Sequence, residues 1–217
     1  YDKNIAIGDY ALDGTKTGGL VGAVAVGYNA LTAITSGGGN TAIGYENSKA
    51  MTDGTQNTSV GASGLYSSTG SNNATLGYNS NFYNVTGSQN VAVGSLAMQG
   101  ASGQSNANNS ALGYKSLYGI TDGAYNVSMG SQSGVNVTTS DHNTYIGGYS
   151  GHFNATGSNN TAIGTNSQYG ASGNSHSNNT SIGYDTLKII TTGTDNVAAG
   201  VQAGTDLTSG SYNVMVG

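Results

Sequence analysis

A five-residue pattern that ends in glycine recurs along the whole chain and constrains the fold more than any other feature. Thirteen copies occur, from NIAIG at residues 4–8 to NVMVG at 213–217, and successive glycines lie 16 to 19 residues apart, most often 17. Self-similarity at such a period is the signature of a repeat array rather than of one thick globular core. We therefore interpret residues 1–217 as a single array without linkers.

Three positions of the pattern alternate between large and small side chains. Positions are counted here from the pattern's glycine, so that −1 is the residue before it and +2 the second residue after it. Position −1 is aliphatic or Met in 12 of 13 copies, −3 is Ile, Val or Thr in 11, and −2 is Ala, Ser or Thr in 11. This alternation predicts a short strand with one apolar and one small-residue face. We expect the apolar face to fill the interior and the small-residue face to lie against a neighbouring chain.

Asparagine occupies position −4 in 12 of 13 copies, and Ala23 is the exception. If the repeats stack about 4.8 Å apart, these side chains form a ladder in which each amide pairs with the next. The glycine then ends the strand at a turn for which a positive φ favours glycine. Residues that represent this structural repeat are Asn40, Ile43, Gly44, Asn57, Val60, Gly61, Asn90, Val93, Gly94, Asn160, Ile163 and Gly164.

A second turn is marked by another glycine with Thr or Asp before it, as in Thr86-Gly87-Ser88 and Asp122-Gly123. Each repeat then supplies two short strands and two turns, which is one coil of a parallel β-solenoid. The fold class predicted is all-β, a β-roll of about 13 coils with a repeat of about 17 residues. A coil of this size encloses few aliphatic side chains, so we expect the chain to need sister copies for stability.

Composition excludes several classes of function. The chain has five Lys, no Arg and a net charge of −5, so it lacks the basic residues that would bind the phosphates of a nucleic acid. It contains no Cys, so disulfides and thiolate metal sites are excluded. Its longest apolar stretch, residues 20–26, is too short to cross a bilayer, and we expect no membrane contact by this segment.

No constellation of reactive side chains stands out. His142 directly precedes an Asn of the pattern, and His152 and His176 lie in variable turns; the three share no face of the coil, so we interpret them as solvated turn residues rather than metal ligands. The ten carboxylates are scattered singly and give no evident acid–base pair. The sequence therefore predicts no catalytic residue, no metal site, no cofactor and no enzymatic activity.

Tyrosine is the one abundant bulky residue, with 15 copies. Five of these directly follow the pattern's glycine: Tyr28, Tyr45, Tyr78, Tyr114 and Tyr184. They either brace the turn or pack between protomers, or they form an exposed aromatic row that binds a sugar or a protein.

The pentads NTAIG at 160–164 and NVAVG at 90–94, followed at +3 by Ser167 and Ala97, resemble the head repeats of trimeric autotransporter adhesins. They are also similar to shaft repeats of phage tail fibres. The resemblance implies a left-handed β-roll, a homotrimer, and a fragment of a longer extracellular fibre on a bacterial surface or a virion tail. It further implies that the fibre either attaches to a host-cell protein or glycan receptor itself or acts as a spacer that holds the attachment surface at a distance. The present repeats are longer than those of adhesin heads, and Asn stands where those heads have Ser.

Two further classes remain open from the residues themselves. A monomeric β-solenoid could bind ice or a glycan, although the five Thr residues at −3 are followed two residues later by an aliphatic residue rather than by Thr. A glycan-degrading solenoid would need a groove of clustered carboxylates, which the scattered Asp and Glu residues do not favour.

Overall fold

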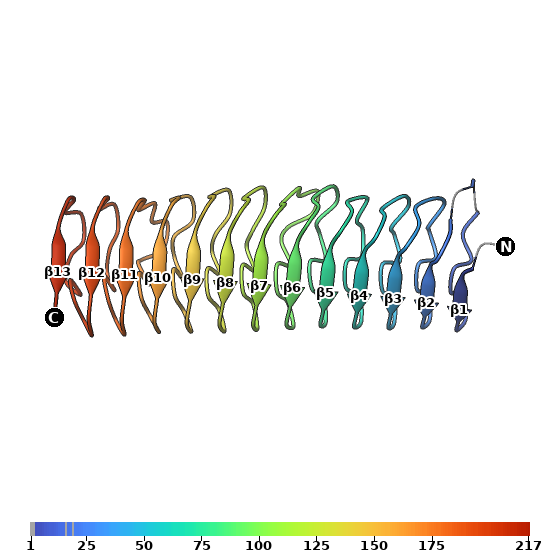
Figure 1. The fold of residues 1–217 in the computed structure, drawn as a ribbon, viewed down its shortest axis with the longest axis horizontal. Coiled ribbons are helices and arrows are strands. Elements are labelled where there is room, and N and C mark those ends of the chain that lie inside the picture. The colour runs from blue at the N-terminus through green and yellow to red at the C-terminus, as the bar shows by residue number, and fades with distance from the viewer. Residues whose placement is uncertain (1–2, 16, 19) are drawn as a thin grey trace. The chain divides into compact units, whose positions relative to one another are not determined.

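The computed structural model describes residues 3–15, 17–18 and 20–217 in two compact units, 1–108 and 109–217. Both units are all-β, and each is a parallel β-solenoid in which consecutive strands are neighbours (Figure 1). This confirms the predicted fold class.

The strands of unit 1–108 are β1 (Ile5–Ile7), β2 (Val24–Val26), β3 (Thr41–Ile43), β4 (Thr58–Val60), β5 (Ala74–Leu76) and β6 (Val91–Val93). Those of unit 109–217 are β7 (Ser110–Leu112), β8 (Val127–Met129), β9 (Thr144–Ile146), β10 (Thr161–Ile163), β11 (Thr180–Ile182), β12 (Val197–Ala199) and β13 (Val214–Val216).

Each strand consists of positions −3 to −1 and pairs in register with the same positions of the next repeat. Ala42 lies opposite Ser59, and Ser128 lies opposite Tyr145. Each repeat is therefore one rung of its unit, and a given position forms a column along the rungs.

Each rung has one strand rather than the two that the sequence predicted. Outside β1–β13, the described residues contain only isolated bridges, Asn84 with Gln104 and Asn154 with Asn174. The reason lies in the backbone after the pattern's glycine, where positions +2 and +4 both adopt positive φ. In the rung of Gly113 these are Lys115 at 54° and Leu117 at 51°. Left-handed residues at alternate positions prevent an extended strand.

The strand faces are oriented opposite to the expectation. In β2 to β12 the central residue is buried and is small in every strand but β9, which has Tyr145, while the residues at −3 and −1 are half-buried or exposed. The apolar interior comes instead from positions +4 and +7, as with Leu117 and Ile120 or Leu187 and Ile190, all of which are fully buried. A small residue at −2 leaves room for these larger side chains within a narrow coil.

The asparagine ladder is present. The Oδ1 atom of Asn126 accepts hydrogen bonds from the backbone N (3.0 Å) and the Nδ2 (3.1 Å) of Asn143, and Asn143 Oδ1 does the same for Asn160 at 3.0 Å each. The second Nδ2 hydrogen of Asn143 reaches the carbonyl of Gly157 at 3.1 Å. The ladder joins Asn40, Asn57, Asn73 and Asn90 in unit 1–108, and Asn109, Asn126, Asn143, Asn160, Asn179, Asn196 and Asn213 in the other.

The pattern's glycine is required by both conformation and space. Gly130 has φ +139°, and a Cβ there would lie 2.5 Å from the carbonyl oxygen of Gly147 in the next rung. The same close approach recurs at successive rungs, so glycine at this position lets the rungs stack.

Candidate functional site: the outer faces of the two units

The strand face carries aliphatic side chains that no part of the described structure covers. Ile43, Leu76, Leu112 and Ile182 are each exposed by more than a third. All four lie at position −1, a column that is aliphatic or Met in every described strand except β12, where it is Ala199. The described strands contain no charged residue. Contiguous apolar surface of this kind marks a protein–protein contact more often than a solvated face.

The five tyrosines at +1 are exposed, as the binding interpretation requires: Tyr28, Tyr45, Tyr78, Tyr114 and Tyr184. Tyr28 and Tyr45 stack with ring centroids 5.5 Å apart. Tyr114 contacts the Nζ atom of Lys115, 5.5 Å from its ring centroid. The structure thus brings two of these residues together in unit 1–108, and their role in binding stays a prediction.

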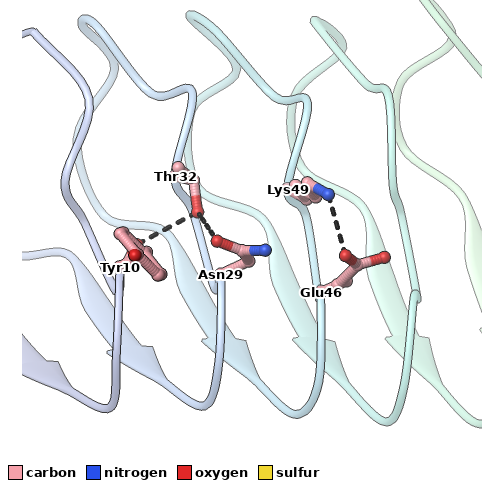
Figure 2. A network of polar contacts seen from close by, with 5 residues as sticks. All are labelled: Tyr10, Asn29, Thr32, Glu46 and Lys49. Carbon is pink, nitrogen blue, oxygen red and sulfur yellow. Dashed lines mark hydrogen bonds and ion pairs between the residues drawn. The ribbon is translucent and has the colours of Figure 1, made fainter.

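A polar network joins positions +2 and +5 of three neighbouring rungs in unit 1–108 (Figure 2). The Oγ1 atom of Thr32 hydrogen-bonds to the carbonyl of Tyr10 at 3.0 Å and to Oδ1 of Asn29 at 3.5 Å. In the next rung Lys49 Nζ bonds Glu46 Oε1 at 2.8 Å. The hydrogen bond from Lys49, supported by one from Asn29, lowers the pKa of Glu46 below its ordinary value.

The same side-chain order recurs at +2 in unit 109–217, where Tyr149, Asn166 and Asp185 occupy successive rungs. Asn166 Nδ2 donates to Asp185 Oδ1 at 2.9 Å, and Lys188 Nζ donates to Asp185 Oδ2 at 2.9 Å. Burial alone would raise the pKa of Asp185, but the hydrogen bonds from Lys188 and Asn166 outweigh it and hold that pKa below its ordinary value. The site thus holds an ionised carboxylate and an ammonium group whose charges balance.

The two networks differ at +5 of the middle rung, where Thr32 in one unit corresponds to Tyr169 in the other. In unit 109–217, Tyr149, Asn166, Tyr169 and Lys188 line an open hollow of about 450 Å³. The rings of Tyr149 and Tyr169 lie 6.4 Å apart and are tilted by 56°. Tyr149 Oη accepts a hydrogen bond from Gln132 Nε2 at 3.1 Å.

One buried and one half-buried aromatic neighbour support the Tyr169 ring. His152 stacks on it at 4.9 Å and 6°, and Phe153 meets it edge-on at 5.2 Å. The prediction that His152 is a solvated turn residue is therefore wrong: it is 8% exposed, and burial lowers its pKa.

The prediction is also wrong for His176, which is fully buried, and burial lowers its pKa to about 4. Both residues lie inside because the solenoid is so narrow that an inward-facing turn position is already interior. His142 is exposed, as expected, and stacks on Tyr125 at 5.1 Å.

Sequence reasoning missed the hollow of Tyr149, Asn166, Tyr169 and Lys188. The signal was available in the spacing, since Asp185 and Lys188 repeat the +2 and +5 offsets of Glu46 and Lys49. Finding it required aligning these columns across three rungs rather than reading the pentads alone.

Residues 3–15, 17–18 and 20–217 contain no group of three or more His, Cys, Asp or Glu residues arranged to hold a metal ion. In the same ranges no helix has the length and apolar character needed to span a membrane. No known protein family, curated protein or solved structure matches the chain.

Proposed function

We infer that this chain is a non-catalytic segment of a homotrimeric extracellular fibre, a left-handed β-roll on a bacterial surface or phage tail that attaches to or spaces host-surface receptors. The observation that carries the inference is the uncovered aliphatic strand face. In each unit a column of Ile, Val, Leu and Met side chains at −1, interrupted at Ala199, is half-buried or exposed beside a mixed −3 column of mostly Val and Thr, while the central residues of β2 to β12 lie inside. Burying such a face stabilises a protein by roughly 25 cal/mol per Å².

A second copy of the same chain fits this face better than an unrelated partner. The −1 side chains repeat at the rung spacing, so a partner with the same spacing can place an aliphatic side chain beside each of them. Cyclic symmetry keeps equal rungs at equal height in every copy and closes the assembly. The adhesin-head resemblance implies three copies and the left-handed winding. The strand face, rather than the small-residue face expected from the sequence, is the surface that we place against sister chains.

The attachment role rests on the fibre resemblance and on exposed aromatic side chains. Tyr45 and Tyr78 are each more than half exposed, beside the end of the strand. Exposed tyrosines supply rigid contact area with a polar tip, which suits the recognition of a receptor.

The test is the native mass of the chain and of two variants with matched chemistry. Ile182→Asp places a charge on the strand face, whereas Ile189→Asp places it in the same rung but off the strand, and the two side chains are 48% and 42% exposed. We expect the unaltered chain and Ile189→Asp to be trimers and Ile182→Asp to dissociate, measured by native mass spectrometry and sedimentation. A wild-type chain that stays a folded monomer contradicts the proposal.

A further inference from the structure

We propose that the hollow lined by Tyr149, Asn166, Tyr169 and Lys188 binds a neutral pyranose unit of a glycan. This inference rests on the proposed attachment role and names a ligand class for it. The hollow's volume of about 450 Å³ lies within the range of sites for small ligands.

Two tyrosine rings give the hollow the surface that the C–H face of a sugar ring needs. Tyr169 is held by His152 on one face and by the edge of Phe153, so its ring is fixed before a ligand arrives. Tyr149 is held by the hydrogen bond from Gln132. A fixed aromatic surface costs little conformational entropy on binding.

The polar side chains supply the donors and acceptors that sugar hydroxyls require. Asp185 is 5% exposed and is anchored by Asn166 and Lys188, so these three groups keep a defined geometry. An ammonium group carries three N–H donors, an amide both donors and an acceptor, and a carboxylate about four acceptor positions. One bond from Lys188 to Asp185 therefore leaves further donors for a ligand.

Charge balance selects the ligand class. The carboxylate of Asp185 and the ammonium of Lys188 are 2.9 Å apart, so the hollow has no net charge from its own groups. An anionic sugar would compete with Asp185 for Lys188, and a cationic ligand would meet the Lys188 ammonium that lines the hollow. A neutral hydroxyl-rich ring can accept from the remaining N–H donors of Lys188 without disturbing the pair.

The corresponding place in unit 1–108 has the polar groups of the hollow without its aromatic wall. Asn29, Glu46 and Lys49 reproduce the polar groups, but Thr32 stands where Tyr169 stands in the other unit, and Asp13 and Gly14 stand where His152 and Phe153 stand. Both units thus carry the same kind of polar network, and only unit 109–217 has a second aromatic side chain, Tyr169, beside it.

The experiment is a calorimetric and NMR titration of the full chain with chitotetraose, mannopentaose and cellopentaose, beside 3′-sialyllactose and a hyaluronan tetrasaccharide as anionic probes. We expect one saturable site per chain for at least one neutral probe and weaker binding of the anionic ones. Tyr169→Ala should weaken association by about tenfold or more, because the stacking surface is lost. Tyr66→Ala is the control. Tyr66 lies at +5, in the same column as Tyr169, but the +2 residues of its own rung and of the two neighbouring rungs are Ser63, Glu46 and Asn79, none of which is a tyrosine.

Tyr169→Phe separates the proposal from a folding defect, because it keeps the aromatic ring and should retain binding of the neutral probe. Absence of saturable binding by every neutral probe overturns the proposal, as does binding of the anionic probes alone. Wild-type affinity in Tyr169→Ala, or loss of binding in a folded Tyr169→Phe, also overturns it. Saccharide binding by a chain whose native mass is that of a monomer would support this site and reject the trimeric fibre.

Discussion

The aromatic ring of Tyr145 fills the space that a side chain at Gly151 would need. Tyr145 occupies position −2, where other rungs have a small residue, and it is fully buried. Gly151 lies at position +4, where five other rungs have Leu, and a Cβ added there would overlap the Tyr145 ring. A large residue at one inward position is thus matched by the smallest residue at another, which preserves the packing of the rung.

This volume exchange predicts the behaviour of substitutions in the Gly151 rung. Gly151→Ala should destabilise the protein by about 2–4 kcal/mol, because the methyl group overlaps a buried ring and the residue has φ +59°. Tyr145→Ala combined with Gly151→Leu recreates the pairing found in the rung of Gly113, Ala111 at −2 with Leu117 at +4, so it should be more stable than either single variant. Chemical denaturation of the original chain, Tyr145→Ala, Gly151→Leu and the double variant measures the coupling energy between the two positions. Additive changes in the free energy of unfolding would contradict the volume exchange.

The asparagine ladder should be a main determinant of stability. Asn143→Ala removes the acceptor for the backbone N and Nδ2 of Asn160 and the donor for Gly157, leaving buried groups without partners. We expect a loss of about 2–4 kcal/mol in the free energy of unfolding. Asn159→Gly, an exposed neighbour with φ 60°, is the control and should stay within about 0.5 kcal/mol of the original chain.

Stability should fall as the pH is lowered from about 6.5 to 4. Burial lowers the pKa of His176 from 6.5 to about 4 in the folded chain, so in this window the unfolded chain binds the additional proton. The corresponding loss of stability is about 3 kcal/mol and should be complete near pH 4. His176→Gln should flatten this part of the curve, measured as unfolding free energy against pH. The paired carboxylates Glu46 and Asp185, whose pKa values are lowered, act at lower pH.

Asn81 is a site where a substitution should stabilise the fold. It lies at +4, the column of Leu65 and Leu117, and is fully buried, and its Oδ1 and Nδ2 atoms have no hydrogen-bond partner. Asn81→Leu should raise the free energy of unfolding by about 1–2 kcal/mol, since relieving two unpaired polar atoms outweighs the preference of Asn for positive φ. A lower midpoint of thermal unfolding would show that these amide atoms are satisfied by water.

The sequence predicts the period, the strand formed by the pattern itself and the ladder because each of these is repeated in nearly every rung, whereas the second strand that it predicts for each rung is absent from the described residues. It does not predict which strand face lies inside. Alternation defines two faces, but the bulk that fills the coil is at +4 and +7, as in Leu117 and Ile120, and only these residues force the strand's aliphatic side chains outward.

The hollow at Tyr169 could not be predicted from the pentads because its residues come from three successive rungs, with 17 positions from Tyr149 to Asn166 and 19 from Tyr169 to Lys188. Asn166 and Asp185 meet only because the rungs stack. The Tyr169 side of the hollow also depends on the interior position of His152, which stacks on the Tyr169 ring. Once the rung register is known, the offsets of Asp185 and Lys188 become informative, since they match those of Glu46 and Lys49.

The ladder also has a direction. In every step the oxygen belongs to the earlier rung and the donors to the later one, as from Asn143 to Asn126. Each amide therefore depends on its immediate neighbours alone, and whole repeats can be gained or lost by duplication without creating a new kind of contact. A lineage of such chains could lengthen or shorten in steps of one rung while the chemistry of every remaining rung stayed the same.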